Sequence, residues 1–66
     1  MNHDDLIGLQ ANVARDMCMN NDVRVRVSRI DDSPMIVTAD YVIGRVNLHL
    51  ETDGKGGQIV IGYSFG

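Results

Sequence analysis

Residues 45–50, with the sequence RVNLHL, decide the fold because apolar and polar side chains alternate along them. Val46, Leu48 and Leu50 therefore share one face, which is the period of two of a strand with one buried side. Residues 23–28, VRVRVS, repeat the alternation. The sequence thus predicts two half-buried strands with a long connection between them.

An amphipathic helix is predicted ahead of the first strand. Apolar side chains recur at spacings of three and four over residues 6–19, the pattern of a helix with one buried face. Gly8 is unfavourable inside a helix, so we place the helix over 9–20. The two asparagines at 20–21 suit its end. Residues 1–5 are polar and acidic, and we expect them to form a short flexible tail.

The rest of the chain divides into turns and one further strand. Residues 31–34, DDSP, are predicted to break the first strand, because Asp and Ser favour turns and Pro34 has no N–H for a ladder. Residues 53–57 form a glycine-rich turn. The apolar run at 59–61 begins a third strand that continues to the end of the sequence. One helix and three strands place the chain in the α+β class.

Length and charge limit the classes of function. With 66 residues, the chain is expected to form one domain over 1–66. Six basic residues against nine acidic ones give a net charge of −3, which argues against a nucleic-acid partner. No apolar run approaches the roughly 20 residues of a membrane helix, so no membrane partner is expected. The acidic start lacks the pattern of a secretory signal. We therefore expect a cytoplasmic monomer, with secretion or release left open.

Cysteine and histidine usage points away from metal or redox chemistry. Cys18 is the single cysteine, so no intrachain disulfide can form, and a small buried hydrophobe is the expected role of its side chain. No second ligand lies at metal-site spacing from His49. We expect no metal, no cofactor and no enzymatic activity.

The connection over residues 31–42 is long for so small a domain, and long loops are often functional. It carries several large apolar side chains. These are Met35, Ile36, Val37 and Tyr41. From the residues alone they are equally compatible with burial in the core and with display to a partner.

Three short motifs stand in a characteristic order: VTADY at 37–41 followed by RVNL at 45–48, LIGL at 6–9, and the closing Gly66. They resemble the potato inhibitor I family of serine-protease inhibitors. The similarity is closer still to the related small bacterial and fungal elastase inhibitors. It extends from residue 6 to residue 66 in matching order and spacing.

The resemblance implies one helix packed on a small mixed three-stranded sheet, with the first two long strands parallel. The connection between those strands would then be a long exposed reactive loop that a protease binds as a mock substrate. The implied reactive bond is Ala39–Asp40. The other implied protease-binding residues are Ile36, Val37, Thr38 and Tyr41. Arg45 and Asn47, two residues apart on one strand face, would support the loop by hydrogen bonds.

The implied function is inhibition of a serine protease. The methyl group of Ala39 buries little area, and each missing CH₂ forgoes about 0.8 kcal/mol in a deep apolar pocket. A subtilisin-like or elastase-like protease is therefore the expected partner. The alternative is a non-inhibitory protein–protein interaction module on the same scaffold, because the longer loop, Val42 and Gly44 depart from the family pattern. A pairing of Arg45 with Asp40 would also fit an ordinary surface ion pair worth about 0–1 kcal/mol.

Overall fold

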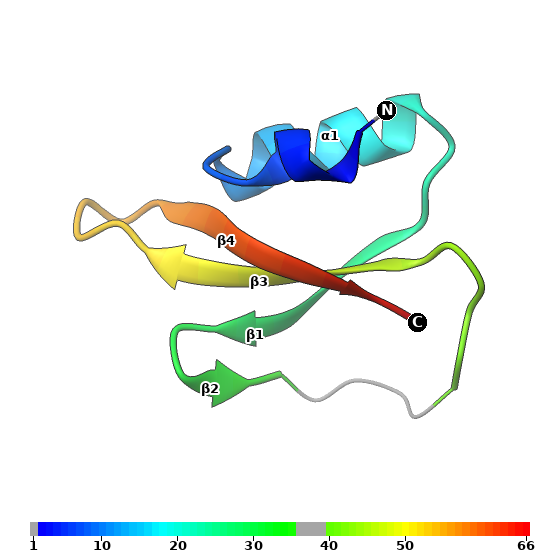
Figure 1. Ribbon diagram of the computed structural model, residues 1–66. Helices are drawn as coiled ribbons and strands as arrows, with labels where there is room; N and C mark the ends of the chain where they lie inside the picture. The colour runs from blue at the N-terminus through cyan, green and yellow to red at the C-terminus, as the bar shows by residue number, and fades with distance from the viewer. Residues whose placement is uncertain (1, 36–39) are drawn as a thin grey trace.

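The computed structural model describes residues 2–35 and 40–66, and it places a helical layer over one face of a β-sheet (Figure 1). The elements in chain order are the 3-10 helix η1 (His3–Leu6), α1 (Ala11–Asn20), β1 (Val25–Ile30), β2 (Ser33–Pro34), β3 (Val46–Thr52) and β4 (Gln58–Phe65). Within the described residues the sheet has four strands in the order β2-β1-β3-β4. The chain is thus a small α+β domain with a mixed sheet.

The two alternating segments form the centre of the sheet, and they run parallel. Val25 of β1 lies opposite Val46 of β3, and Val27 lies opposite Leu48. Parallel strands begin at the same end of a sheet, so the chain must return along the full length of the strands between them. This requirement explains why the connection from β1 to β3 is long. β4 then pairs antiparallel with β3 on its other side.

The strand β2 corrects the prediction of three strands and of a plain turn at 31–34. Ser33 pairs antiparallel with Ile30, and Pro34 lies opposite Arg29. The next residue, Met35, donates its N–H to the Ser28 oxygen at 3.0 Å. Pro34 therefore occupies the alternate position of an edge ladder, where no N–H is needed.

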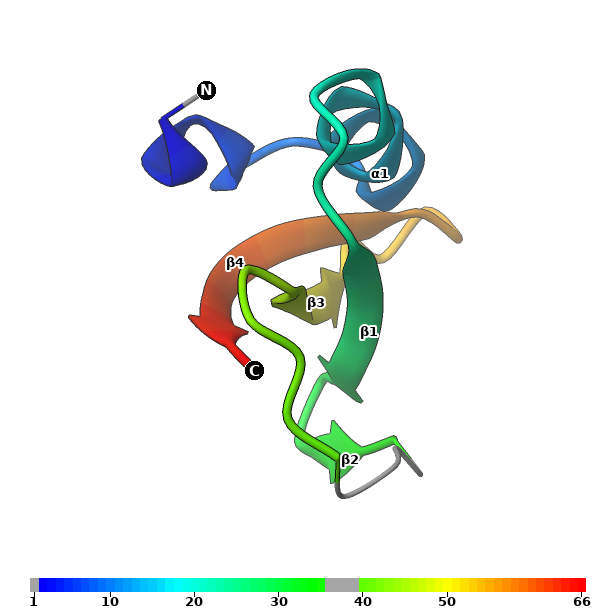
Figure 2. The same ribbon diagram turned by 90° about the vertical axis from the view of Figure 1, so that its right-hand side faces the viewer.

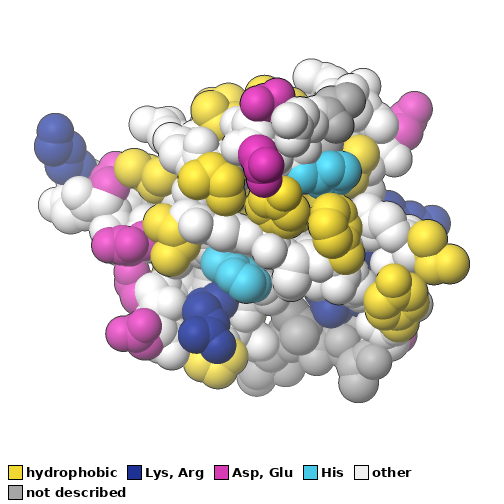
Figure 3. Space-filling view, in the orientation of Figure 1, with side chains coloured by type: hydrophobic (Ala, Val, Ile, Leu, Met, Phe, Trp, Pro, Cys, Tyr) yellow, Lys and Arg dark blue, Asp and Glu magenta, His cyan; other side chains and the backbone are white. Residues whose placement is uncertain are grey.

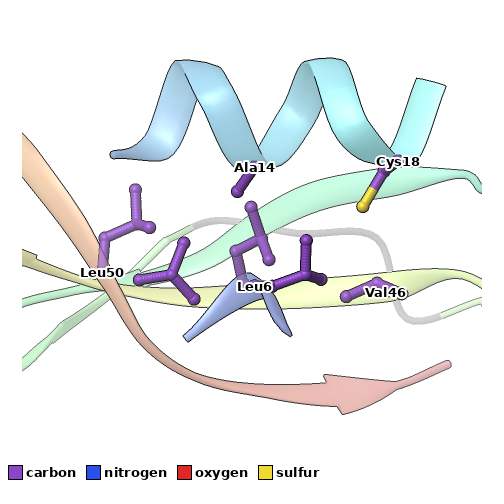
Figure 4. Packing of buried hydrophobic residues seen from close by; sticks show 7 residues of the cluster. Leu6, Ala14, Cys18, Val46 and Leu50 are labelled. Carbon is purple, nitrogen blue, oxygen red and sulfur yellow. The ribbon is translucent and has the colours of Figure 1, made fainter. Parts of the chain in front are cut away.

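The core lies between the helical layer and the sheet, where α1 and η1 contribute small and large apolar groups (Figure 4). Its fully buried members are Leu6, Ala14, Cys18, Val46, Leu48, Leu50 and Val60. The predicted helix over 9–20 agrees closely with α1, whose buried side chains point at the sheet. No helix in the described part of the chain is long and apolar enough to cross a membrane.

The N-terminal segment differs from the flexible tail expected at 1–5. His3–Leu6 forms a 3-10 helix, and Leu6 is completely buried in the core. Residues 8–10 then run along β4 before α1 begins. Gly8 donates its N–H to the Val60 oxygen at 2.8 Å, and Val60 donates back to Leu9 at 2.9 Å. These bonds cover the outer edge of β4 at its beginning.

Candidate functional site

The candidate site is the base of the β1–β3 connection, residues 40–45, which lies at the end of the sheet where β3 begins and β4 finishes (Figure 2). Several residues that the sequence assigned to the loop lie outside the described residues. These are Ile36, Val37, Thr38 and Ala39. The described members are Asp40, Tyr41, Arg45 and Asn47.

Arg45 bridges the connection and the sheet, and its side chain is only 12% exposed. Its Nη2 atom donates to the backbone oxygen of Asp40 at 2.8 Å and to that of Gly66 at 2.6 Å. Its Nε atom also donates to Gly66, at 3.2 Å. The ion pair between Nη1 and the Asp40 carboxylate is longer, 3.5 Å, and Asp40 is 55% exposed. The backbone contacts therefore hold Asp40 more strongly than the ion pair does.

The backbone oxygen of Gly66 accepts from both sides of this site. Besides Arg45, the N–H of Val42 donates to it at 3.2 Å, and the N–H of Gly66 donates to the Arg45 oxygen at 3.0 Å. Residues 42–45 themselves form a turn, in which Arg45 donates its N–H to the Val42 oxygen at 3.1 Å. Gly44 occupies this turn with φ of +79°, a conformation that side chains disfavour. The end of β4 thus fixes the trailing half of the loop.

Tyr41 packs against Gly66 and accounts for the glycine at that position. A Cβ built on Gly66 would lie 2.9 Å from Tyr41 Cδ2 and 3.0 Å from Cε2. The φ of Gly66 is +112°, which also favours glycine. Gly66 is buried, whereas the Tyr41 side chain is 72% exposed. The Cδ2–Cε2 edge of the tyrosine ring lies next to Gly66, and most of Tyr41 remains in solvent.

Apolar side chains on both sides of the connection are displayed rather than buried. Met35 is 43% exposed on the leading side, and Tyr41 is exposed on the trailing side. These two side chains are therefore exposed to solvent and do not belong to the core. Ile43 is 88% exposed at the tip of the 42–45 turn, and the sequence analysis did not select it. Its signal in the sequence is a β-branched apolar residue directly before a turn glycine, where a polar residue or proline is usual.

Asn47 lies in β3 and contacts the sheet rather than the described part of the loop. Its Oδ1 atom accepts from Arg26 Nε at 2.6 Å, and its Nδ2 atom donates to Ser64 Oγ at 3.5 Å. Asn47 is nearly buried, so these bonds satisfy a polar group that would otherwise be costly. Among the described residues, the support of the loop base comes from Arg45, which the structure brings to Asp40, and from Gly66.

The described residues contain no cluster of metal ligands and no exposed thiol. No group of three or more His, Cys, Asp or Glu side chains lies close enough there to hold a metal ion. Cys18 is buried in the core, and burial raises the pKa of its thiol. A raised pKa leaves less of the reactive thiolate at neutral pH. The Cys18 side chain therefore acts as a packing group.

No protein family, curated protein or solved structure matches the chain.

Proposed function

We propose that the chain inhibits a subtilisin-like or elastase-like serine protease through a substrate-like loop, with the reactive bond at Ala39–Asp40. The observation that carries the proposal is the bracket formed by Arg45 and the Gly66 oxygen around residues 40–45. This bracket holds the residue on the leaving side of the proposed bond. The motifs at 37–41 and 45–48, which resemble the potato inhibitor I family, add sequence support.

Preorganisation is the physical reason why such a loop inhibits. A flexible peptide loses backbone entropy of about 1–2 kcal/mol for each residue that becomes ordered on binding. A loop already held at its base avoids much of this cost and binds more tightly. Arg45 is well suited to hold it because its planar guanidinium donates several hydrogen bonds in fixed directions.

The same bracket would slow hydrolysis of the bound loop. In the proposed reaction, the protease serine attacks the Ala39 carbonyl, an acyl ester forms, and the amine of Asp40 is the leaving group. The backbone oxygen of Asp40 is tied to Arg45 at 2.8 Å, so the released amine stays beside the ester. It can attack the ester and restore the peptide bond before water replaces it.

The proposed target follows from the side chains that would enter its subsites. Ala39 fits a shallow pocket, and a large apolar or acidic specificity pocket gains little from a methyl group. On the other side of the bond, Tyr41 and Ile43 offer exposed apolar surface. A protease with small or tolerant specificity before the bond and an apolar surface after it fits this combination best.

The experiment is a titration of subtilisin with the purified chain, with mass spectrometry of the mixture over hours. We expect stoichiometric loss of activity while the chain stays intact, or slow cleavage only between Ala39 and Asp40. Trypsin serves as the comparison protease, and stronger inhibition of trypsin would show that Ala39 does not occupy the specificity position. Rapid degradation without inhibition would refute the proposed function.

A matched pair of variants tests the role of the bracket. Arg45→Met removes the donors to Asp40 and Gly66 and keeps an unbranched side chain. Arg24→Met makes the same change at an exposed arginine directly before β1. We expect faster cleavage of the loop in Arg45→Met, because hydrogen bonds of a charged group contribute about 1.5–3 kcal/mol. Arg24→Met should resemble the original chain, and equal effects of the two changes would remove the basis of the proposal.

A non-inhibitory interaction module is the second candidate. It is favoured by Asn47, whose side-chain bonds to Arg26 and Ser64 lie within the sheet. A less supported loop would be cut by subtilisin within residues 36–42 without inhibiting it. The titration therefore separates the two candidates directly.

A further inference from the structure

The N-terminal helix η1 contacts the end of β4 through three aromatic rings. The His3 ring lies 5.0 Å from the Phe65 ring in an edge-to-face arrangement, at an interplanar angle of 80°. It also lies 5.9 Å from the Tyr63 ring. Tyr63 and Phe65 contact each other at 5.6 Å and 74°. Edge-to-face ring pairs of this kind are favourable beyond the apolar area that they bury.

A hydrogen bond closes the same contact. The Tyr63 hydroxyl donates to Asp4 Oδ1 at 2.6 Å, across 59 positions of sequence. Asp4 is itself held in η1, because its N–H donates to the Asn2 side chain at 3.0 Å. Leu6 anchors the other end of η1 in the core. The helix is thus fixed at one end and attached to β4 at the other.

The contact between η1 and β4 lies at the end of β4 that leads to Gly66. β4 is an edge strand of the sheet, so a neighbouring strand pairs with it on one side only. Residues 8–10 cover its outer edge at Ile59 and Val60. Tyr63 and Phe65 lie opposite Leu48 and Val46 of β3, so their side chains are on the helix-covered face of the sheet, where η1 contacts them. Figure 3 shows the face of the molecule that Figure 1 presents, on which hydrophobic, acidic and histidine side chains are visible.

Phe65 is followed directly by Gly66, whose oxygen accepts from Val42 and from Arg45. We propose that η1 is a clasp that holds the end of β4 in register, and that Asp4 and Tyr63 thereby act as positioning residues for Arg45 and the loop base. The effect of this clasp on inhibition rests on the proposed function. The effect of the clasp on the order of the loop base does not rest on it, and can be measured without a protease.

The test is hydrogen exchange of single backbone amides, measured by NMR on the full chain. The amides of Val42 and Gly66 report on the loop base, because they donate to Gly66 and to Arg45 respectively. The amide of Val23, which donates to Cys18 at 2.8 Å near the end of α1, and that of Leu48 in the buried strand are the references. Asp4→Ala and Tyr63→Phe each remove one partner of the clasp bond.

We expect exchange at Val42 and Gly66 to become about 2- to 12-fold faster in both variants, the range of a typical hydrogen bond. The double variant should be no faster than either single one, because both changes break the same bond. Asp4→Asn keeps an acceptor oxygen and should restore most of the protection. Asp5→Ala is the matched control, since it removes the same charge from the same helix, where Asp5 is exposed.

The outcomes separate a clasp from a general loss of stability, and from failure of the proposed function. If Val23 and Leu48 exchange faster by the same factor, the contact is merely structural and the inference is overturned. Unchanged exchange at Val42 and Gly66 also overturns it, whatever the chain does to subtilisin. If exchange responds as expected but the original chain does not inhibit, the clasp stands and only inhibition fails. If the chain inhibits, Asp4→Ala should also cause faster cleavage of the loop, and this effect should disappear in an Arg45→Met background.

Discussion

Replacing Gly66 by alanine should disturb the loop base while leaving the core intact. The new methyl carbon would lie 2.9 and 3.0 Å from two atoms of the Tyr41 ring. Favourable contacts between carbon atoms have separations of about 3.5–4.0 Å, so these two distances are too short. The backbone is also strained, because Gly66 has φ of +112°, and a side chain in a sparsely populated region costs about 1–3 kcal/mol. Tyr41 is 72% exposed, so its ring can move away more easily than the strand.

Gly54→Ala is the control for this change. Gly54 also has a positive φ, +82°, but a Cβ there meets no atom within 4 Å. Both variants should therefore lose about 1–3 kcal/mol of unfolding free energy from the backbone alone. That is a large fraction of the roughly 3–10 kcal/mol expected for a chain of this length. Only Gly66→Ala should displace the Tyr41 ring.

Two measurements decide the outcome. Urea unfolding followed by circular dichroism gives the free energies, and the NMR resonances of the Tyr41 ring report its displacement. The reasoning is refuted if Gly66→Ala is as stable as the original chain, or if the Tyr41 resonances shift equally in the two variants. A subtilisin digest adds the functional consequence, with faster loop cleavage expected in Gly66→Ala alone.

Three further predictions concern titration and surface contact. The N–H of Thr52, and then its hydroxyl, donate to the Asp31 carboxylate and lower its pKa. The stabilisation from these bonds is present above a pH of about 4 and is lost as the pH falls below it. The urea midpoints measured at low and at neutral pH should therefore differ less in Asp31→Asn than in the original chain. The hydrogen bond to Asp4 raises the pKa of Tyr63. The stabilisation from this bond is present below a pH of about 10 and is lost as the pH rises further. In Tyr63→Phe, the urea midpoint should therefore fall less steeply at alkaline pH than in the original chain. Ile43→Ser should leave the unfolding free energy within about 0.5 kcal/mol and weaken protease inhibition by about tenfold or more if Ile43 is buried in the complex.

Each of these predictions has a contrasting outcome. Asp32→Asn, at the exposed neighbour of Asp31, should keep the full acid dependence. A steep alkaline fall of the midpoint that persists in Tyr63→Phe would mean that another group causes it. Met19→Ser replaces an apolar side chain that is 65% exposed on α1. If it weakens inhibition as much as Ile43→Ser does, the effect of Ile43 is not a local contact with the protease.

Local periodicity predicted the elements whose pattern is carried by their own residues. The helix over 9–20 and the strands at 23–28 and 45–50 correspond to α1, β1 and β3 within a few positions. Their apolar faces bury against one another, so sequence pattern and packing agree. Alternation alone does not specify whether β1 and β3 run parallel. That expectation came from the resemblance of the motifs to the potato inhibitor I family, and the two strands are parallel.

The elements that the sequence did not reveal depend on distant partners. η1 consists of polar residues before Leu6, and its contacts are with Tyr63 and Phe65 at the other end of the sequence. β2 contains Pro34, which is tolerated because it occupies the position in the edge ladder that needs no N–H. Neither arrangement has a short-range signal. Sequence reasoning therefore interpreted the first as a tail and the second as a turn.

The candidate site shows the same division. Arg45 was recognisable as a donor with a carboxylate five positions before it. Its strongest partner, however, is the Gly66 backbone oxygen, 21 positions away. Any residue carries a backbone oxygen, so no residue type marks this acceptor. What the sequence does offer is the glycine itself, and the structure explains it through the Tyr41 ring and a positive φ.

The choice of acceptor determines how firmly the loop base is held. The Asp40 carboxylate is 55% exposed and lies 3.5 Å from Arg45, so water and salt weaken that contact and the side chain can rotate away. The Gly66 oxygen accepts from Arg45 Nε and Nη2 and from the Val42 N–H, so several donors together fix its position. Arg45 is therefore oriented by the sheet, and it transmits this orientation to the Asp40 backbone at 2.8 Å. A small core can thus hold the base of a long connection, residues 40–45, through one buried guanidinium.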